Sequence, residues 1–247
     1  MRILIVNDDG IDSKGLYALA DALSENNEIT VVAPDGNRSA FSHSLTINSD
    51  LFFKERKISD KFSSFTLSGT PADCVKFAVH YFKDKKFDLV CSGINIGNNL
   101  GSDTLYSGTV AAGIEGNYFG IPAIAFSNLE YDGLKFEENA KVIKNIFGDL
   151  LNYISSEYTL NVNIPNISSD RIKGLKFTKL GSLHYADYYE KSETGGYRLK
   201  GEPILREAAA DEDIFWAYRD HVTVTPISYN RTNTEALSKM LKKENVG

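Results

Sequence analysis

The chain has 247 residues, of which 42% are hydrophobic and 24% are charged, and it contains six prolines. This composition is typical of a soluble globular protein and argues against a disordered chain. The net charge of −6 argues against a surface that binds nucleic acid polymers by neutralising their phosphates. A small anionic substrate is still compatible with this charge, because a bound cation can reverse the local field.

The first predicted strand ends in two adjacent acids. Ile3 to Val6 form a short apolar run of the kind found in parallel strands covered on both faces, and Asp8 and Asp9 follow it. Ligand sites in such folds lie beyond the carboxyl ends of the strands, and neighbouring carboxylates need a cation or several donors to stay ionised. The segment therefore predicts a divalent-cation site, although a turn with a helix cap would use the same residues.

Strand-like and helix-like patterns alternate through the first two thirds of the chain. They predict an α/β fold with a doubly wound, mostly parallel sheet, Rossmann-like and in three layers. Core strands are expected at residues 28–34, 87–91 and 121–126, and half-polar strands at 48–57 and 62–67. Helices are expected behind Ser13, behind Thr70 with Pro71 and Asp73, behind Ser107, and over residues 142–154.

The pattern changes after about residue 160. Residues 161–165 and 222–226 predict two more strands, and Thr232 with Glu235 predicts a capping box for a last helix. Residues 181–206 are rich in tyrosine and charge, with a turn at Gly195 and Gly196, and predict a projecting β-hairpin arm within a single domain spanning residues 1–247. A solvated, flexible loop is the alternative for this segment.

Two features concern the compartment. Cys74 and Cys91 lie in apolar settings without CxxC spacing, which favours buried thiols in a reducing compartment over a disulfide or zinc pair. The N-terminal apolar run has only four residues, and no segment approaches a membrane span. We therefore expect a cytoplasmic protein without a membrane partner.

Three more loops near the ends of predicted core strands carry residues suited to a metal and phosphate site. Hydroxyls, amide oxygens, one guanidinium and a helix N-terminus can together hold a cation and an anion. The candidates are Asn37, Arg38, Ser39 and Ser42 in the second loop, Asn95, Asn98 and Asn99 in the third, and Ser107, Gly108 and Thr109 in the fourth. Taken alone, each loop is also explained by a polar connection, turn-forming asparagines or a helix cap, but their shared sheet edge favours one site.

Two histidines have undecided roles. His43 lies in the second loop, and His221 precedes the last predicted strand. An imidazole beside a phosphate can protonate a leaving oxygen, whereas a lone histidine more often has a structural or surface role. The sequence does not choose between these roles for His43 or His221.

Five motifs occur in one order along the chain. They are Asn-Asp-Asp-Gly-Ile at 7–11, Val-Ala-Pro-Asp at 32–35 leading to Arg38 and Ser39, Ser-Gly-Thr-Pro-Ala-Asp-Cys-Val at 68–75, Ser-Gly-Ile-Asn-Ile-Gly-Asn-Asn at 92–99, and Tyr-Ser-Gly-Thr-Val-Ala-Ala at 106–112. Weaker matches follow at 161–165 and 222–226. With these motifs the chain resembles the SurE survival-protein family, whose members are metal-dependent nucleotidases that remove phosphate from nucleoside monophosphates.

The resemblance implies roles for particular residues. One divalent cation, Mg²⁺ or Mn²⁺, would be held by Asp8, Asp9, Ser39 and Asn95, and the turn of Ser107, Gly108 and Thr109 would bind the anion. The arm would join subunits into a homodimer or homotetramer. The chain has Phe41 and His43 where the family commonly has small residues, and Lys179 where arginine is frequent, which concerns substrate preference and arm contacts.

The resulting interpretation is a phosphomonoesterase that acts on nucleoside 5′- or 3′-monophosphates, with short polyphosphate as a further candidate substrate. Asp9 is expected to orient or deprotonate the attacking water, and Asp8 to act chiefly as a ligand. Outer contacts to the substrate are expected from Asn37, Arg38, Ser42, Asn98 and Asn99.

A receiver-type signalling module is the main alternative, because such a module also begins with a strand that ends in paired acids. The later core strand here runs into Cys91, Ser92 and Gly93, with no acceptor aspartate at its end. A dinucleotide-dependent oxidoreductase is a weaker alternative, since no GxGxxG follows the first strand.

Overall fold

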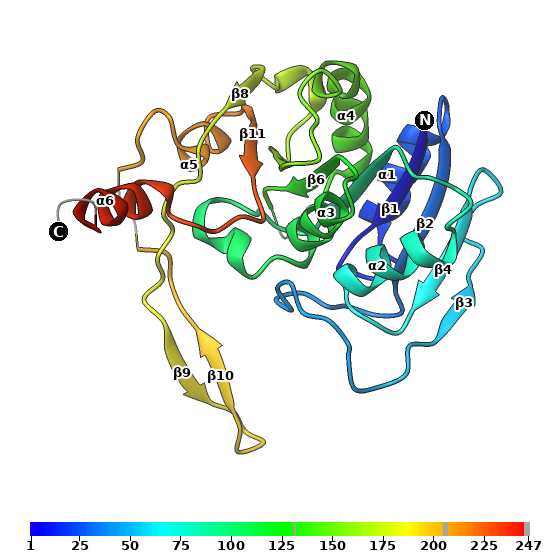
Figure 1. The fold of residues 1–247 in the computed structure, drawn as a ribbon, viewed down its shortest axis with the longest axis horizontal. Helices are drawn as coiled ribbons and strands as arrows, with labels where there is room; N and C mark the ends of the chain where they lie inside the picture. The colour runs from blue at the N-terminus through cyan, green and yellow to red at the C-terminus, as the bar shows by residue number, and fades with distance from the viewer. Residues whose placement is uncertain (131, 205–206, 245–247) are drawn as a thin grey trace.

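The computed structural model describes residues 1–130, 132–204 and 207–244 (Figure 1). The strands are β1 Arg2–Val6, β2 Glu28–Pro34, β3 Phe53–Glu55, β4 Ser63–Leu67, β5 Leu89–Asn95, β6 Ala123–Asn128, β7 Thr159–Ile164, β8 Leu175–Phe177, β9 Tyr188–Lys191, β10 Tyr197–Lys200 and β11 Val222–Ile227. The helices are α1 Lys14–Ser24, α2 Pro71–Tyr81, α3 Gly108–Tyr118, α4 Phe136–Leu150, α5 Asp213–Ala217 and α6 Thr234–Glu244, with short 3₁₀ turns at Gly101–Leu105 and Ser169–Arg171.

A nine-stranded sheet runs through the molecule in the order β3-β4-β2-β1-β5-β6-β7-β11-β8. The strands from β4 to β7 are parallel, while β3 pairs antiparallel with β4 and β11 pairs antiparallel with β7. The chain leaves β1 toward β2 and β4, and then returns to the other side of β1 with β5. This reversal of strand order confirms the predicted doubly wound sheet, and it falls between β1 and β5, whose carboxyl ends are where ligands bind in such folds.

Helices cover both faces of the sheet, as Figure 1 shows, and give the predicted three layers. Ile3 and Ile5 of β1 belong to the core that includes the buried side chains of α1 and α4, whereas Leu4 and Val6 belong to the core under α2. Successive strand residues point to opposite faces, so a strand covered on both sides must be apolar throughout. The continuous apolar run of β1 follows from this burial.

The predicted cap forms at the start of α2 but not at the start of α1. At α2 the Thr70 hydroxyl accepts from the Asp73 N–H at 3.1 Å, and the Asp73 carboxylate accepts from the Thr70 N–H at 2.9 Å, which confirms the reciprocal cap. Ser13 occupies the cap position of α1, but its side chain makes no capping hydrogen bond.

The prediction of a Thr232 and Glu235 box is wrong. Helix α6 begins at Thr234, and the Asn233 side chain accepts from the Ala236 N–H at 2.9 Å. Asparagine caps helices as well as threonine does, so the local sequence offered two adjacent starts.

Several element boundaries differ from those predicted, and three of the differences have a clear structural origin. Strand β5 continues to Asn95 instead of ending at Cys91, because Asn95 still pairs with Ser127 of β6 after a register shift. The half-polar segment 48–57 contributes only Phe53–Glu55, at the edge of the sheet. Helix α4 starts at Phe136 and ends at Leu150, while Ile154 packs on the core from the segment beyond it.

The predicted arm is a two-stranded antiparallel hairpin of β9 and β10 that projects from the body of the molecule (Figure 1). All of its strand residues are exposed, and Gly195 adopts a φ of +85° in the connecting turn. Residues 205 and 206 of the predicted arm lie outside the described residues. Among the helices described, none has both the length and the apolar character required to cross a membrane.

Candidate active site

The loop after β1 lies against the loop after β2. The Asn7 side chain closes a tight turn, donating to the Gly10 carbonyl at 3.0 Å and accepting from the Gly10 N–H at 3.2 Å. Gly10 has a φ of +97°, and a Cβ there would lie 3.0 Å from the carbonyl carbon of Gly36. Glycine is therefore required where the two loops meet.

Asp8 lies at the N-terminus of α3 and is 3% exposed. Its carboxylate accepts a hydrogen bond from the Thr109 hydroxyl, and a Cβ on Gly108 would lie 2.8 Å from the Asp8 Cβ. Burial raises the pKa of Asp8, and hydrogen bonds from the Thr109 side chain and the backbone of Thr109 and Gly108 offset only part of the rise. The helix end thus stabilises the ionised carboxylate incompletely.

Asp9 is partly buried next to this first acid. Burial and then the neighbouring charge of Asp8 raise the pKa of Asp9 to about 7, while the Ile96 N–H lowers it from 3.2 Å away. The largest effects that lower the pKa of the two acids are hydrogen bonds. A cation between the acids would add to the stabilisation of their ionised forms.

The donors at this edge of the sheet are oxygens. In the part of the chain that the structure describes, no group of three or more histidine, cysteine or acidic side chains is placed to hold a metal ion. A cation would therefore depend on hydroxyl and amide oxygens in addition to the two carboxylates. Such an oxygen-only set fits a hard ion such as Mg²⁺ or Mn²⁺.

The loop after β2 is tied to the first acid through its backbone. The Arg38 N–H donates to the Asp8 carbonyl at 2.7 Å, and the Ser39 N–H donates to the Asn37 side-chain oxygen at 2.8 Å. The Arg38 guanidinium forms an ion pair with Asp35 at 2.8 Å, and Ser39 is exposed. The structure thus brings the predicted second loop to the acids, but it already uses the Arg38 charge and the Asn37 oxygen within that loop.

Asn95 ends β5 and is 8% exposed. Its side-chain amide donates to the Gly97 carbonyl at 3.0 Å, and within the described residues no hydrogen bond reaches its Oδ1. The next residue, Ile96, donates its N–H to Asp9 at 3.2 Å. Chain connectivity therefore places Asn95 beside the second acid with a side-chain oxygen that is not otherwise engaged.

Asn98 and Asn99 have different surroundings. The Asn99 N–H donates to the Asn163 side chain at 2.8 Å, and its side-chain amide donates to the Ser127 hydroxyl at 2.8 Å. The Asn99 carbonyl accepts from the side chains of Asn161 at 2.8 Å and Asn163 at 3.1 Å. Asn98 instead keeps a buried side-chain oxygen without a hydrogen-bond partner among the described residues. Asn99 therefore anchors the loop to β6 and β7.

Ser127, Asn161 and Asn163 support this loop and are absent from the residues predicted for the site. All three are fully buried. A signal was available in the sequence, because asparagines recur at alternate positions of the predicted strand 161–165, and a buried asparagine needs hydrogen-bond partners. Only the fold identifies those partners as the backbone of the glycine-rich loop.

The predicted anion-binding turn begins α3. The Ser107 hydroxyl accepts from the Val110 N–H at 3.1 Å, so the helix-cap role of Ser107 is confirmed. The Thr109 hydroxyl binds Asp8, and Gly108 lets the helix end approach that acid closely. The capacity of this turn to bind an anion therefore lies mainly in its backbone N–H groups and the helix dipole.

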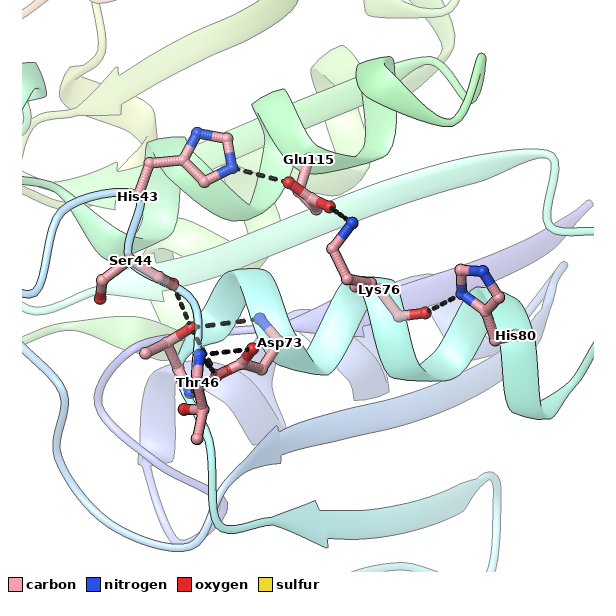
Figure 2. Close-up of polar contacts among 8 residues, drawn as sticks. His43, Ser44, Thr46, Asp73, Lys76, His80 and Glu115 are labelled. Atoms are coloured by element: carbon pink, nitrogen blue, oxygen red, sulfur yellow. Dashed lines mark hydrogen bonds and ion pairs between the residues drawn. The ribbon is translucent and has the colours of Figure 1, made fainter. Parts of the chain in front are cut away.

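Ser42 and His43 attach the second loop to α3 and the segment before it. The Ser42 N–H donates to the Tyr106 carbonyl at 3.0 Å, and its hydroxyl donates to the Leu105 carbonyl at 2.7 Å. His43 Nε2 lies 2.8 Å from Oε2 of Glu115, as Figure 2 shows. These contacts extend the second loop from the acids along α3.

His221 has a different setting. Its Nδ1 lies 2.8 Å from the Arg219 carbonyl, and its ring packs edge-on against Trp216 with centroids 4.9 Å apart. The structure therefore joins His221 to the end of α5, whereas His43 belongs to the loop that borders the acids.

Comparison with known proteins identifies the family of the chain. The family model "Survival protein SurE" matches residues 3–187. A Petrotoga mobilis protein named "5'-nucleotidase SurE" is 41% identical over 246 residues, covering 97% of this chain and 98% of the relative. The protein of that name from Clostridium beijerinckii is 41% identical, covering 98% of each chain. The crystal structure of the SurE protein from Aquifex aeolicus has a TM-score of 0.85 and 40% identity, covering 99% of this chain and 100% of that one. The chain therefore belongs to the SurE survival-protein family.

Proposed function

We propose that the chain is a divalent-metal-dependent phosphomonoesterase that hydrolyses nucleoside 5′-monophosphates to nucleoside and phosphate. The names of its relatives support this activity. One observation carries the proposal, namely that Asp8 is buried against the N-terminus of α3 and bonded to Thr109. A carboxylate pair suited to a cation and a helix end suited to phosphate thereby share one edge of the sheet.

Asp8, Asp9, Ser39 and Asn95 would hold the cation, either Mg²⁺ or Mn²⁺. When bound, such an ion withdraws charge from phosphoryl oxygens and makes water more acidic. Asp9 would accept the proton of the attacking water, since it is the less buried of the two acids. Asp8, which already accepts the Thr109 hydroxyl, would act chiefly as a ligand.

The backbone of Ser107, Gly108 and Thr109 would hold the equatorial phosphate oxygens, on which charge spreads in the transition state. Outer contacts to the substrate are proposed for Asn37, Arg38, Ser42, Asn98 and Asn99. Among these, Asn98 has the buried oxygen that the described residues leave without a partner. Asn99 would contribute by fixing the loop, because its N–H, its carbonyl and its side-chain amide are all engaged.

The proposal extends to the whole molecule. Residues 1–247 would form one domain, with 181–206 as an arm that joins subunits into a homodimer or homotetramer. Nucleoside 3′-monophosphates and short polyphosphate are further candidate substrates. A cytoplasmic location is supported by Cys74 and Cys91, which are buried free thiols whose pKa is raised by burial.

Phosphate release from a panel of nucleoside monophosphates tests the activity. We expect turnover with Mg²⁺ or Mn²⁺, loss of turnover after EDTA treatment, and recovery when the metal is added back. Polyphosphate and a simple aryl phosphate in the same panel measure how far the substrate range extends. Full activity after chelation, or no release from any nucleotide with either metal, would contradict the proposal.

A further inference from the structure

Residues 37–46, named here the Ser39 loop, lead from the acid pair to the N-termini of α3 and α2. Several contacts outside the loop hold it. They are Arg38 N–H to the Asp8 carbonyl, Ser42 N–H and hydroxyl to the Tyr106 and Leu105 carbonyls, the Thr70 hydroxyl to the Ser44 carbonyl at 2.7 Å, and the Thr46 N–H to both Asp73 carboxylate oxygens at 3.1 Å. The loop needs such contacts, because Ala40 and Ser42 have φ of 61° and 55°, in the left-handed region that is unfavourable for them.

One side-chain anchor comes from the body of α3. Figure 2 shows Glu115 between His43 of the loop and Lys76 of α2. His43 Nε2 lies 2.8 Å from Glu115 Oε2, and Lys76 Nζ lies 2.9 Å from Glu115 Oε1. Glu115 therefore links three segments of the chain through one carboxylate.

Glu115 is only 4% exposed, so the negative charge of its carboxylate must be compensated by nearby donors or cations. Burial alone would raise the pKa of Glu115, but hydrogen bonds from His43 and Lys76 outweigh it and lower the pKa below its ordinary value. Glu115 lies seven residues after Gly108, or about 10 Å along the helix, which is too far from the anion-binding turn to touch a phosphate there. Its effect on the site would have to pass through the Ser39 loop.

We propose that Glu115 is a positioning residue, which holds the Ser39 loop against the N-terminal end of α3 through His43. The inference rests on the proposed function, because the turn beside the loop is the proposed phosphate site. With the anchor in place, substrate meets a loop already ordered by its contacts with Leu105 and Tyr106. Without the anchor, the loop must become ordered when substrate binds. The cost of this ordering lowers the affinity for substrate more than the turnover number.

Hydrogen exchange of the full chain measures the anchor without any need for activity. His43→Ala removes a side chain that is 26% exposed, so the core is not opened. We expect the loop amides, including the bonded amides of Ser42 and Thr46, to exchange about tenfold faster, while α3 keeps its protection. His80→Ala is the matched control, because His80 lies 2.7 Å from the Lys76 carbonyl on α2 and is not bonded to the loop (Figure 2).

Kinetics separate positioning from catalysis. Glu115→Gln and His43→Ala should each raise KM for a nucleoside monophosphate about tenfold, with kcat changed less than about threefold. p-Nitrophenyl phosphate should show the same change in KM, since positioning does not depend on the leaving group. The double variant should lose no more than the worse single variant, and His43→Gln, which keeps an N–H donor, should recover part of the loss.

Three results would overturn the proposal. A kcat loss confined to nucleotides, with p-nitrophenyl phosphate unaffected, would make His43 a catalytic acid. Faster exchange throughout α3 would show a general structural role for the pair. Unchanged loop exchange in His43→Ala would show that the anchor does not hold the loop. A wild-type protein that releases no phosphate would refute the proposed function alone, because the exchange experiment still reports on the anchor.

Discussion

Two regions of the molecule differ in where their contacts come from. One is the edge of the sheet with the two acids, and the other is the projecting hairpin. At the edge, Asp8 is buried and bonded to Thr109, and Asp9 accepts from Ile96, so partners come from distant parts of the sequence. In the hairpin, β9 and β10 pair with each other in a local register, and their side chains are exposed.

The two regions differ in the partner proposed for each. The edge holds two carboxylates whose pKa values are raised, so it needs positive charge. The hairpin exposes Tyr188, Tyr189 and Tyr197, and aromatic surface of this kind usually meets another surface. The first region is the proposed site for a cation and a phosphate, and the second is the proposed contact with another subunit.

The base of the arm is firmly attached to the body. Asp213 accepts the N–H groups of Gly101 and Gly181, both at 2.8 Å, and the Tyr185 hydroxyl donates to Asp103 at 2.7 Å. Gly101 and Asp103 lie in the turn that leads to α3. A substitution at the arm base could therefore disturb the segment before the anion-binding turn. A substitution in the hairpin strands lies away from that segment.

The largest expected effect is at the acid pair. Asp8→Asn and Asp9→Asn should each lower phosphatase turnover more than about a hundredfold while the fold is kept, since each removes a ligand charge. Phosphate release and circular dichroism measure the two outcomes. Asp12→Asn is the control, because Asp12 lies in the same loop but is exposed and pairs with Arg56. Near wild-type turnover in either acid variant would contradict the proposed site.

A second test concerns the close approach of α3 to the acids. Gly108→Val would place a Cβ 2.8 Å from the Asp8 Cβ and 3.0 Å from Pro71 Cγ, so the helix end must move. We expect inhibition by vanadate to weaken about tenfold or more, and the free energy of unfolding to fall by about 1–3 kcal/mol. Gly148→Ala, where a Cβ meets nothing within 4 Å, is the control. Unchanged vanadate inhibition in a folded variant would place the phosphate elsewhere.

A third test uses pH in the absence of metal. Because the pKa of Asp9 rises from 3.8 to about 7 on folding, the folded protein binds that proton more tightly than the unfolded chain. This contribution to stability is full below about pH 4 and is lost as pH rises through about 7. In EDTA, Asp9→Asn should therefore be more stable than wild type at pH 8 by about 1–3 kcal/mol, with a smaller gain at pH 5. Thermal unfolding at the two pH values checks the difference, and an equal gain at both would refute this origin.

The smallest effect on the fold is expected from the hairpin. Replacing residues 188–200 with a short glycine-serine linker should change the free energy of unfolding of the separate subunit by less than about 0.5 kcal/mol, because these strands are exposed and pair with each other. Light scattering should show a smaller assembly, while Mn²⁺ still binds at the acids. If the mass of the assembly does not change, the interface lies elsewhere.

Some parts of the fold were predictable from the local sequence alone. The apolar run of β1 and the reciprocal cap of Thr70 and Asp73 were predictable, since burial on both faces and the spacing of a capping box leave local patterns. The extent of β5 was not predictable from the sequence, because Ser92 and Gly93 resemble a loop. Only the pairing with β6 continues the strand to Asn95. Helix α6 starts one residue later than predicted, because Asn233 and Thr232 are both good capping residues and Asn233 forms the cap.

The sequence by itself determined the alternation of strands and helices, the acids at the end of β1 and the glycine-rich loops at the same edge of the sheet. Only the tertiary structure decided which partner each polar side chain has. It assigns the Thr109 hydroxyl to Asp8, Asn99 to Asn163 and His43 to Glu115, across 101, 64 and 72 residues of sequence. The physical reason is that a local pattern fixes which way a side chain faces, whereas a hydrogen-bond partner depends on how distant elements pack.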